Sequence, residues 1–78
     1  MYYVYILQTE SRGKFYIGHT NNLKERIKRH NEGRSGYTKR GQWKLYYFEK
    51  YKTRSEAMRR EKEIKYKKSR RYIENLGS

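Results

Sequence analysis

The stretch Tyr2-Tyr3-Val4-Tyr5-Ile6-Leu7 (YYVYIL) decides how this sequence folds. It consists of aromatic and aliphatic side chains, which is typical of a β-strand. Side chains alternate between the two faces of a strand, and here both faces are apolar. One face holds Tyr3, Tyr5 and Leu7, and the other holds Tyr2, Val4 and Ile6. A strand that is apolar on both faces is usually central in its sheet, so we expect this one in the middle.

Two further strands are predicted around this centre. The turn-like residues 10–13 lead into a second strand over residues 14–19, so the first two strands form a hairpin. The second strand contains Phe15-Tyr16-Ile17-Gly18-His19 and again holds aromatic residues. A third strand is expected over residues 43–51 (WKLYYFEKY), which are also rich in aromatic residues.

Capping residues predict three helices. The side chain of an N-cap residue accepts a hydrogen bond from the first turn, and a Glu three residues later can return one. The sequence offers Asn22 with Glu25 for a helix over residues 23–31, Thr53 with Glu56 for a helix over residues 54–68, and Ser69 for a short third helix. We therefore predict an α+β fold of order β-β-α-β-α-α, in which helices flank a small three-stranded antiparallel sheet. Residues 1–78 form one domain.

Composition limits the environment and the partners of the chain. Its 78 residues carry a formal net charge of +13, which favours a polyanion and above all nucleic acid. It contains no cysteine, which fits a cytoplasmic location and excludes disulfides and thiolate zinc sites. No apolar run is long enough to span a membrane, and the N-terminus lacks the layout of a signal peptide.

The positive charge is concentrated in two segments. Residues 50–71 hold eleven Lys or Arg and only three Glu, including the basic side chains Arg59, Arg60 and Lys65. Residues 32–42 hold three glycines with Arg34, Lys39 and Arg40 between them, and we expect them to form a basic loop. Most charge runs are solvated helix faces, but an excess of one sign favours a polyanion partner.

Glu61 has an unusual position on the second predicted helix. On a helical wheel it lies about 40° from Ala57 and about 60° from Ile64, in the middle of the apolar stripe. Burying a carboxylate is costly unless it is paired or binds a metal. Either a nearby Lys or Arg neutralises Glu61, or the carboxylate points at the tyrosines of the sheet.

Arg26 and His30 are four residues apart on the first predicted helix and therefore stack beside its apolar line. An arginine suits phosphate oxygens, and a histidine can move or orient a proton. Taken alone, this pair is more simply explained by a surface Arg and a half-buried His. The chain contains no Asp and no phosphate-binding loop, which argues against a Ser-His-Asp triad and against nucleotide hydrolysis.

Taken together, these residues resemble the GIY-YIG nuclease superfamily, and in particular its small stand-alone bacterial group of YhbQ-like proteins. Tyr16-Ile17-Gly18 matches the second signature letter for letter, and Arg26, His30 and the segment Ser55–Lys65 follow at the expected spacing. The first signature departs from the family, because Tyr3-Val4-Tyr5 stands where Gly-Ile-Tyr is usual. The resemblance extends from Tyr2 to about Asn75.

The resemblance implies a metal-dependent endonuclease that hydrolyses phosphodiester bonds in DNA, or alternatively in RNA. Glu61 would be the sole protein ligand of one Mg²⁺ or Mn²⁺. Tyr5 would help to deprotonate the attacking water, and Tyr16 would orient water or phosphate, although the sequence leaves open which of the two is the base. Arg26 would stabilise charge on the phosphate, and His30 would assist proton transfer. Gly18 would allow close packing, while His19 and Asn75 would support the site.

Two other functions are compatible with the sequence. The same scaffold could be a non-catalytic module that binds nucleic acid, with tyrosines that stack on unpaired bases. The charge alone would also suit a basic structural protein of a ribonucleoprotein particle.

Overall fold

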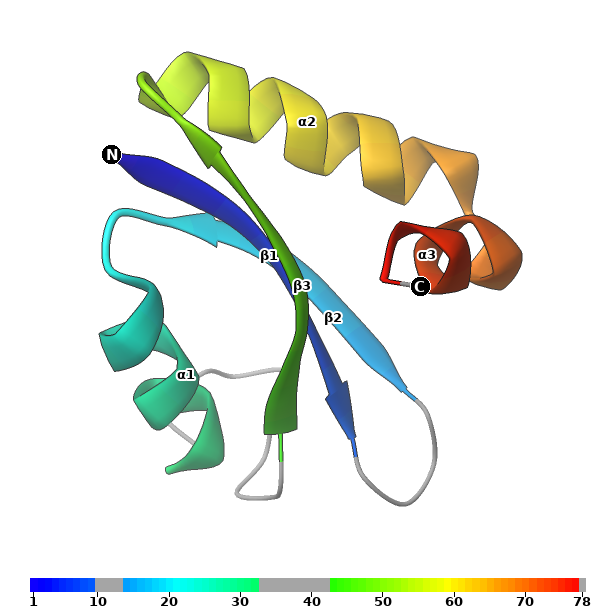
Figure 1. Cartoon of the computed structure of the whole chain (residues 1–78), viewed down its shortest axis with the longest axis horizontal. Helices are drawn as coiled ribbons and strands as arrows, with labels where there is room; N and C mark the ends of the chain where they lie inside the picture. Colours follow the sequence, from blue (N-terminus) through cyan, green and yellow to red (C-terminus); the bar gives the residue numbers. More distant parts are fainter. Residues whose placement is uncertain (10–13, 33–42, 78) are drawn as a thin grey trace.

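The computed structural model describes residues 1–9, 14–32 and 43–77 and has the predicted architecture (Figure 1). Its strands are β1 (Tyr2–Thr9), β2 (Phe15–Thr20) and β3 (Trp43–Tyr51), and its helices are α1 (Leu23–Asn31), α2 (Arg54–Lys67) and α3 (Arg70–Leu76). The sheet is antiparallel in the order β2-β1-β3, which confirms β1 as the central strand. No helix within these described ranges is long and apolar enough to cross a membrane.

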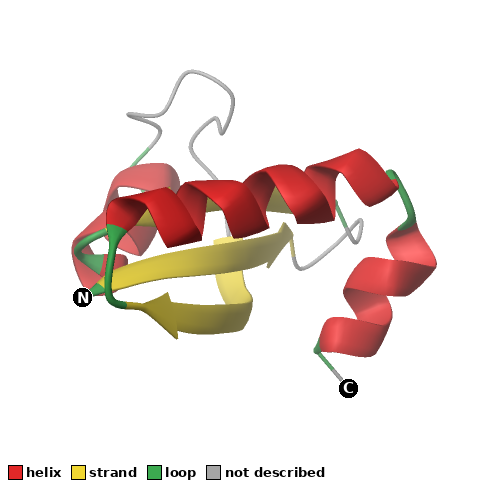
Figure 2. Cartoon of the chain, turned by 90° about the horizontal axis from the view of Figure 1, so that it is seen from above, coloured by secondary structure: helices red, strands yellow, loops and turns green. Residues whose placement is uncertain are grey.

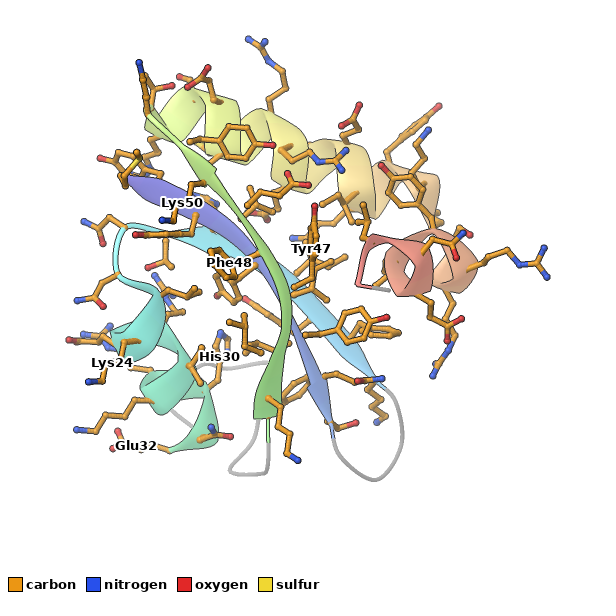
Figure 3. The ribbon with its side chains drawn as sticks, in the orientation of Figure 1. Lys24, His30, Glu32, Tyr47, Phe48 and Lys50 are labelled. Atoms are coloured by element: carbon orange, nitrogen blue, oxygen red, sulfur yellow. The ribbon has the colours of Figure 1, made fainter. Side chains whose placement is uncertain are left out.

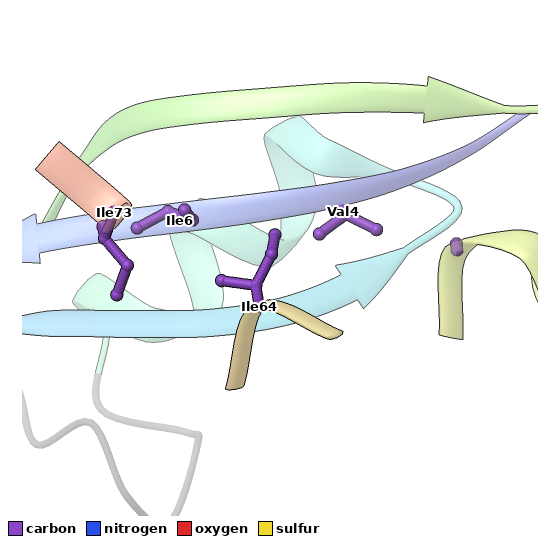
Figure 4. Close-up of a cluster of buried hydrophobic side chains, with 5 residues drawn as sticks. Val4, Ile6, Ile64 and Ile73 are labelled. Carbon is purple, nitrogen blue, oxygen red and sulfur yellow. The ribbon is translucent and has the colours of Figure 1, made fainter. Parts of the chain in front are cut away.

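The sheet separates α1 on one face from α2 and α3 on the other (Figure 1). Figure 2, turned by 90°, shows α2 lying across the strands. On this face Val4 and Ile6 pack against Ala57, Ile64 and Ile73 (Figure 4). The sheet therefore has a covered apolar core on the α2 side, as the two-faced strand predicts.

The α1 face of the sheet holds a second buried cluster. Tyr5, Leu7 and Trp43 form its centre, and Leu23 and Ile27 of α1 pack against it. Tyr5 is only 1% exposed, although a phenol carries a polar hydroxyl. This burial matters because a buried Tyr hydroxyl normally needs a hydrogen-bond partner.

The predicted caps start all three helices. The Asn22 side chain accepts from the Glu25 amide at 3.1 Å, and the Ser69 hydroxyl accepts from the Tyr72 amide at 3.2 Å. Thr53 and Glu56 form the full reciprocal capping box. These caps fix where α1 and α2 begin, and therefore how their side chains are aligned with the sheet.

Element ends differ slightly from the prediction. β1 continues to Thr9, β2 runs from Phe15 to Thr20, and α2 ends at Lys67. Lys68 follows α2 in the left-handed conformation with φ 48°, which reverses the chain into α3. The predicted basic loop, with Arg34, Lys39 and Arg40, lies outside the described residues.

A network of hydrogen bonds joins β3 to α2 and α3. Glu49 accepts from Arg60 Nε at 2.9 Å and Nη2 at 3.2 Å, and also from the hydroxyls of Tyr47 and Tyr51. Tyr47 projects from β3 toward the α2 and α3 side (Figure 3). Arg60 also contacts Glu63, and it donates to the Tyr72 hydroxyl at 3.0 Å.

This network changes the interpretation of Arg60. The sequence suggests a nucleic-acid contact for Arg60, but its guanidinium is engaged by two carboxylates and a phenol. These partners raise the already high pKa of Arg60, with the hydrogen bond to Glu49 as the largest cause. Arg60 therefore ties α2 to β3, and its guanidinium is committed to that contact.

Candidate active site

A polar cleft of about 360 Å³ lies at the C-terminal end of β2, an edge strand of the sheet. Side chains from both sheet faces reach it, because alternate residues of β2 point to opposite sides. It is lined by Tyr2, Tyr5, Tyr16, Gly18, His19, Thr20, Asn21, Arg26, Arg54 and Glu61. The cleft thus brings together four of the five residues for which the sequence predicts a catalytic role.

Gly18 lets the Tyr5 phenol extend across β2 to this edge. The two residues face each other across the β1–β2 ladder. A Cβ atom at position 18 would lie 2.8 Å from the Tyr5 hydroxyl and 3.2 Å from the Tyr16 ring. Any larger residue would therefore collide with Tyr5, which gives a physical reason for glycine here.

His30, the fifth predicted residue, lies behind Tyr5. His30 is fully buried at the end of α1 and points toward the sheet (Figure 3). Its Nε2 lies 3.0 Å from the Tyr5 hydroxyl, so the buried phenol has its hydrogen-bond partner. The Tyr16 ring packs on His30, and their ring centroids are 4.5 Å apart. The centroids of the Tyr16 and Tyr5 rings are 6.2 Å apart.

The environment keeps both members of the Tyr5–His30 pair neutral at pH 7. Burial, together with the nearby Tyr16 and Glu61, raises the pKa of Tyr5 well above its ordinary value, although Arg26 opposes this. Burial and the charge of Arg26 lower the pKa of His30. A neutral imidazole beside a neutral phenol can accept a hydrogen bond from it.

The end of α1, where His30 sits, is tied to the start of β3. The Asn31 side chain donates to the Trp43 carbonyl at 3.1 Å and accepts from the Trp43 amide at 2.6 Å. This pair of bonds mimics a strand-to-strand contact and fixes the helix end against the sheet. No local sequence pattern predicts this contact, because the two residues are twelve positions apart.

Glu61 enters the cleft from α2, on the helix face that also carries the buried Ala57 and Ile64. Its Oε1 accepts from His19 Nδ1 at 2.5 Å, and its Oε2 accepts from Lys65 Nζ at 2.7 Å. Burial alone would raise the pKa of Glu61, but the hydrogen bonds from Lys65 and His19 outweigh it and lower the pKa. Glu61 is therefore a carboxylate at neutral pH.

The donor set of the cleft fits a hard divalent cation. Glu61 is the only carboxylate among the lining residues in the described part of the chain. Mg²⁺ typically binds proteins through one or two carboxylates and keeps several waters, so a single glutamate in a polar cleft is sufficient. Among residues 1–9, 14–32 and 43–77 there is no cluster of three or more His, Cys, Asp or Glu, so a site rich in protein ligands is not formed there.

Other predicted residues are spread over the molecule. Asn75 lies exposed on α3 and is not among the lining residues of the cleft, while Arg59 and Lys65 are exposed on α2. Sequence reasoning missed Arg54, the first residue of α2, whose side chain lines the cleft. The capping box at Thr53 fixes where Arg54 starts the helix, but only the packing of α2 on the sheet shows which site it faces.

Comparison with known proteins agrees with this geometry. A family model described as the GIY-YIG catalytic domain matches residues 1–74. The chain belongs to the GIY-YIG catalytic domain family. This confirms the resemblance seen in the sequence, and the family is one of nuclease-type domains.

The relatives are bacterial proteins named UPF0213. One from Bacillus licheniformis is 41% identical over 78 residues, covering 94% of this chain and 79% of the relative. One from Clostridium perfringens is 49% identical over 67 residues, covering 83% of this chain and 71% of the relative. The solution NMR structure of a UPF0213 protein from Bacillus halodurans is 34% identical, with a TM-score of 0.59 over the whole of this chain and 88% of the other.

Proposed function

We propose that this chain is a divalent-metal-dependent endonuclease that hydrolyses phosphodiester bonds in DNA or RNA. The observation that carries the proposal is the 3.0 Å contact between Tyr5 and His30, at a cleft that Glu61 and Arg26 also line. Phosphodiester hydrolysis needs a base for water and positive charge for the phosphate. Tyr5 and His30 would supply the base, and Arg26 together with a cation held by Glu61 would supply the positive charge.

Tyr5 and His30 would act as the proton acceptor. With the proton of the neutral His30 on Nδ1, the Tyr5 hydroxyl donates to Nε2, so the phenol oxygen can take a proton from water as its own proton moves to Nε2. The raised pKa of Tyr5 means that its phenol would hardly ionise near neutral pH. The relay avoids this difficulty, because Tyr5 gains one proton as it gives up another and never becomes a free phenolate. His30 suits this role because its lowered pKa keeps it unprotonated.

Positive charge for the phosphate would come from two sources. Arg26 and Arg54 line the cleft, and a guanidinium fits phosphate oxygens with two parallel hydrogen bonds. Glu61 would hold Mg²⁺ or Mn²⁺, which supplies Lewis-acid stabilisation of the developing negative charge when bound. His19 would orient the Glu61 carboxylate through its 2.5 Å hydrogen bond.

The basic surface outside the cleft would hold the nucleic-acid backbone without sequence preference. Exposed Arg59 and Lys65 of α2 belong to the segment in which Lys and Arg far outnumber Glu. Contacts of this kind release counterions, so binding should weaken steeply as salt increases.

Removal of the Tyr5 hydroxyl tests the proposal. Purified protein is incubated with supercoiled plasmid and Mg²⁺ or Mn²⁺, and nicking is compared with that of Tyr5→Phe. We expect nicking that EDTA abolishes and that Tyr5→Phe lowers by about 10²-fold or more. Tyr46→Phe is the matched control, because Tyr46 does not line the cleft and its hydroxyl donates to the Glu74 carbonyl of α3. Unchanged nicking by Tyr5→Phe would overturn the proposed relay.

A second function, a binding module that no longer cuts, is favoured by one observation. Both Glu61 oxygens already accept hydrogen bonds, from His19 and from Lys65, so a metal would have to share the carboxylate with these donors or displace one of them. The plasmid assay separates the two functions. A module of this kind would shift plasmid mobility on a gel and leave it intact with either metal.

A further inference from the structure

The α1 side of β3 carries an apolar groove of about 530 Å³ that is separate from the catalytic cleft. Its lining includes Tyr3, Leu23, Lys24, Ile27, Phe48 and Lys50, and we call it the aromatic groove. Phe48 and Lys50 extend from β3 on the side of α1, and Lys24 lies on α1 (Figure 3). The aromatic groove is therefore bordered by two cations.

Two aromatic rings form the floor of the aromatic groove. The ring centroids of Tyr3 and Phe48 are 6.1 Å apart and tilted by 59°, and Phe48 is 41% exposed. Tyr3 stands at the position where the first family signature has glycine. The departure from the signature thus adds a ring beside Phe48, where glycine would leave none.

The aromatic groove is connected to the catalytic cleft around the start of α1. A neighbouring hollow shares Thr20, Asn21 and Arg26 with the cleft, and it also contains Arg29, which forms an ion pair with Glu25 at 3.3 Å. The same hollow shares Asn22 with the aromatic groove. Cleft, hollow and groove therefore adjoin one another around the start of α1, and the guanidinium groups of Arg26 and Arg29 line the middle one.

We propose that the aromatic groove binds unpaired nucleotides that continue from the strand in the cleft. This inference rests on the proposed function for the identity of the substrate, and it narrows that substrate to nucleic acid with a single-stranded segment beside the cut. Exposed rings stack on bases of any sequence, and flanking cations hold the phosphates. None of the described residues that line the groove is acidic, so its charge complements a polyanion.

A protein segment is the other chemistry that an apolar groove can accept. The two bordering lysines and the net charge of +13 favour nucleic acid, because they attract phosphates and have no electrostatic partner on an apolar helix. The hollow between cleft and groove supports the same choice, since it places both sites within reach of one nucleic-acid strand.

Oligonucleotide binding without metal tests the inference independently of cutting. The probe is a fluorescent thymidine oligonucleotide of roughly 12 nucleotides, measured by anisotropy in EDTA. We expect Phe48→Leu to weaken binding by about tenfold, because leucine keeps the apolar volume and removes the stacking face. An abasic oligonucleotide of equal length should bind the wild type weakly and should not respond to Phe48→Leu.

Tyr66→Leu is the matched control, since Tyr66 is an exposed ring on α2 (84% exposed) away from the aromatic groove. Equal losses for Phe48→Leu and Tyr66→Leu would overturn the inference. So would equal binding of the thymidine and abasic probes. Self-association that Phe48→Leu abolishes, with unchanged oligonucleotide binding, would assign the groove to a second copy of the chain.

Cleavage of two substrates then separates this inference from the proposed function. A duplex with a single-stranded flap should be cut faster than a fully paired duplex, and Phe48→Leu should remove the difference. If the wild type cuts both substrates equally, the inference fails while the nuclease proposal stands. If neither is cut but the anisotropy result holds, the nuclease proposal fails and the groove remains a binding site for unpaired nucleotides.

Discussion

Glu49 and Glu61 are similar carboxylates in different surroundings. Their side chains are 19% and 16% exposed, and cationic partners keep the pKa of each below its ordinary value, although burial opposes this in both. Glu49 is held by the planar guanidinium of Arg60 and by two phenols. Glu61 is held by a single imidazole and by an exposed lysine, and it borders a polar cleft.

The partners decide what each carboxylate can do. The four acceptor positions of Glu49 are all occupied, two by the bidentate guanidinium of Arg60 and two by the tyrosine hydroxyls. These donor side chains are themselves partly buried. The Lys65 side chain is 53% exposed and flexible, so it can leave Glu61 at small cost. The comparison indicates that Glu49 stabilises the fold, whereas Glu61 remains available for a ligand.

The largest expected effect distinguishes the two residues by activity. Glu61→Gln should lower plasmid nicking by about 10²-fold or more, because the amide cannot supply the negative charge that holds a divalent cation. Glu49→Gln should nick at the wild-type rate at temperatures where it is folded. The measurement is the initial rate of nicking, with folding checked by circular dichroism. Comparable losses in both folded variants would remove the distinction.

Stability should show the opposite order. Glu49→Gln should lower the free energy of unfolding by about 2 kcal/mol, because Arg60 loses one of its two carboxylate partners and the amide NH₂ cannot accept from a tyrosine hydroxyl as the replaced oxygen did. Urea denaturation followed by tyrosine fluorescence measures the change. Glu74→Gln is the control, since its ion pair with Arg70 is exposed and should be worth less than about 0.5 kcal/mol. A loss in Glu74→Gln as large as that in Glu49→Gln would contradict the structural role of Glu49.

The pH dependence of stability should follow the same network. The folded pKa of Glu49 lies below its ordinary value of 4.5, so its stabilising effect is complete above pH 4.5 and declines as pH falls further. Urea titrations between neutral and acidic pH should therefore show wild-type stability decreasing below pH 4.5, and Glu49→Gln should follow a shallower curve. Parallel curves would mean that Glu49 is not the titrating group.

The smallest effect concerns the lysine beside Glu61. Lys65→Met should change the free energy of unfolding by less than about 0.5 kcal/mol, because an exposed pair four residues apart on a helix contributes little. It should also tighten Mn²⁺ binding in the absence of nucleic acid, since one Glu61 oxygen loses its competitor. Isothermal calorimetry measures this affinity. Weaker Mn²⁺ binding in Lys65→Met would argue against Glu61 as the ligand.

Much of the fold could be predicted from local sequence. The two-faced apolar pattern of YYVYIL requires burial on both sides, and this is met only by a central strand. The caps at Asn22, Thr53 and Ser69 act within a few residues, so their positions in the sequence fix the helix starts. The same local periodicity correctly assigned Glu61 to the sheet-facing side of its helix.

The tertiary structure decided which of these side chains meet. Arg60 lies next to Glu61 in a basic segment, yet it forms an ion pair with Glu49, eleven residues earlier on β3. The His19 contact with Glu61 and the Tyr5 contact with His30 likewise join residues 42 and 25 positions apart. Such contacts depend on strand register and on how each helix packs on the sheet. Local sequence patterns do not specify the register or the packing at the level of single residues. The sequence determined the elements and the chemical groups available, and packing determined which groups share a site.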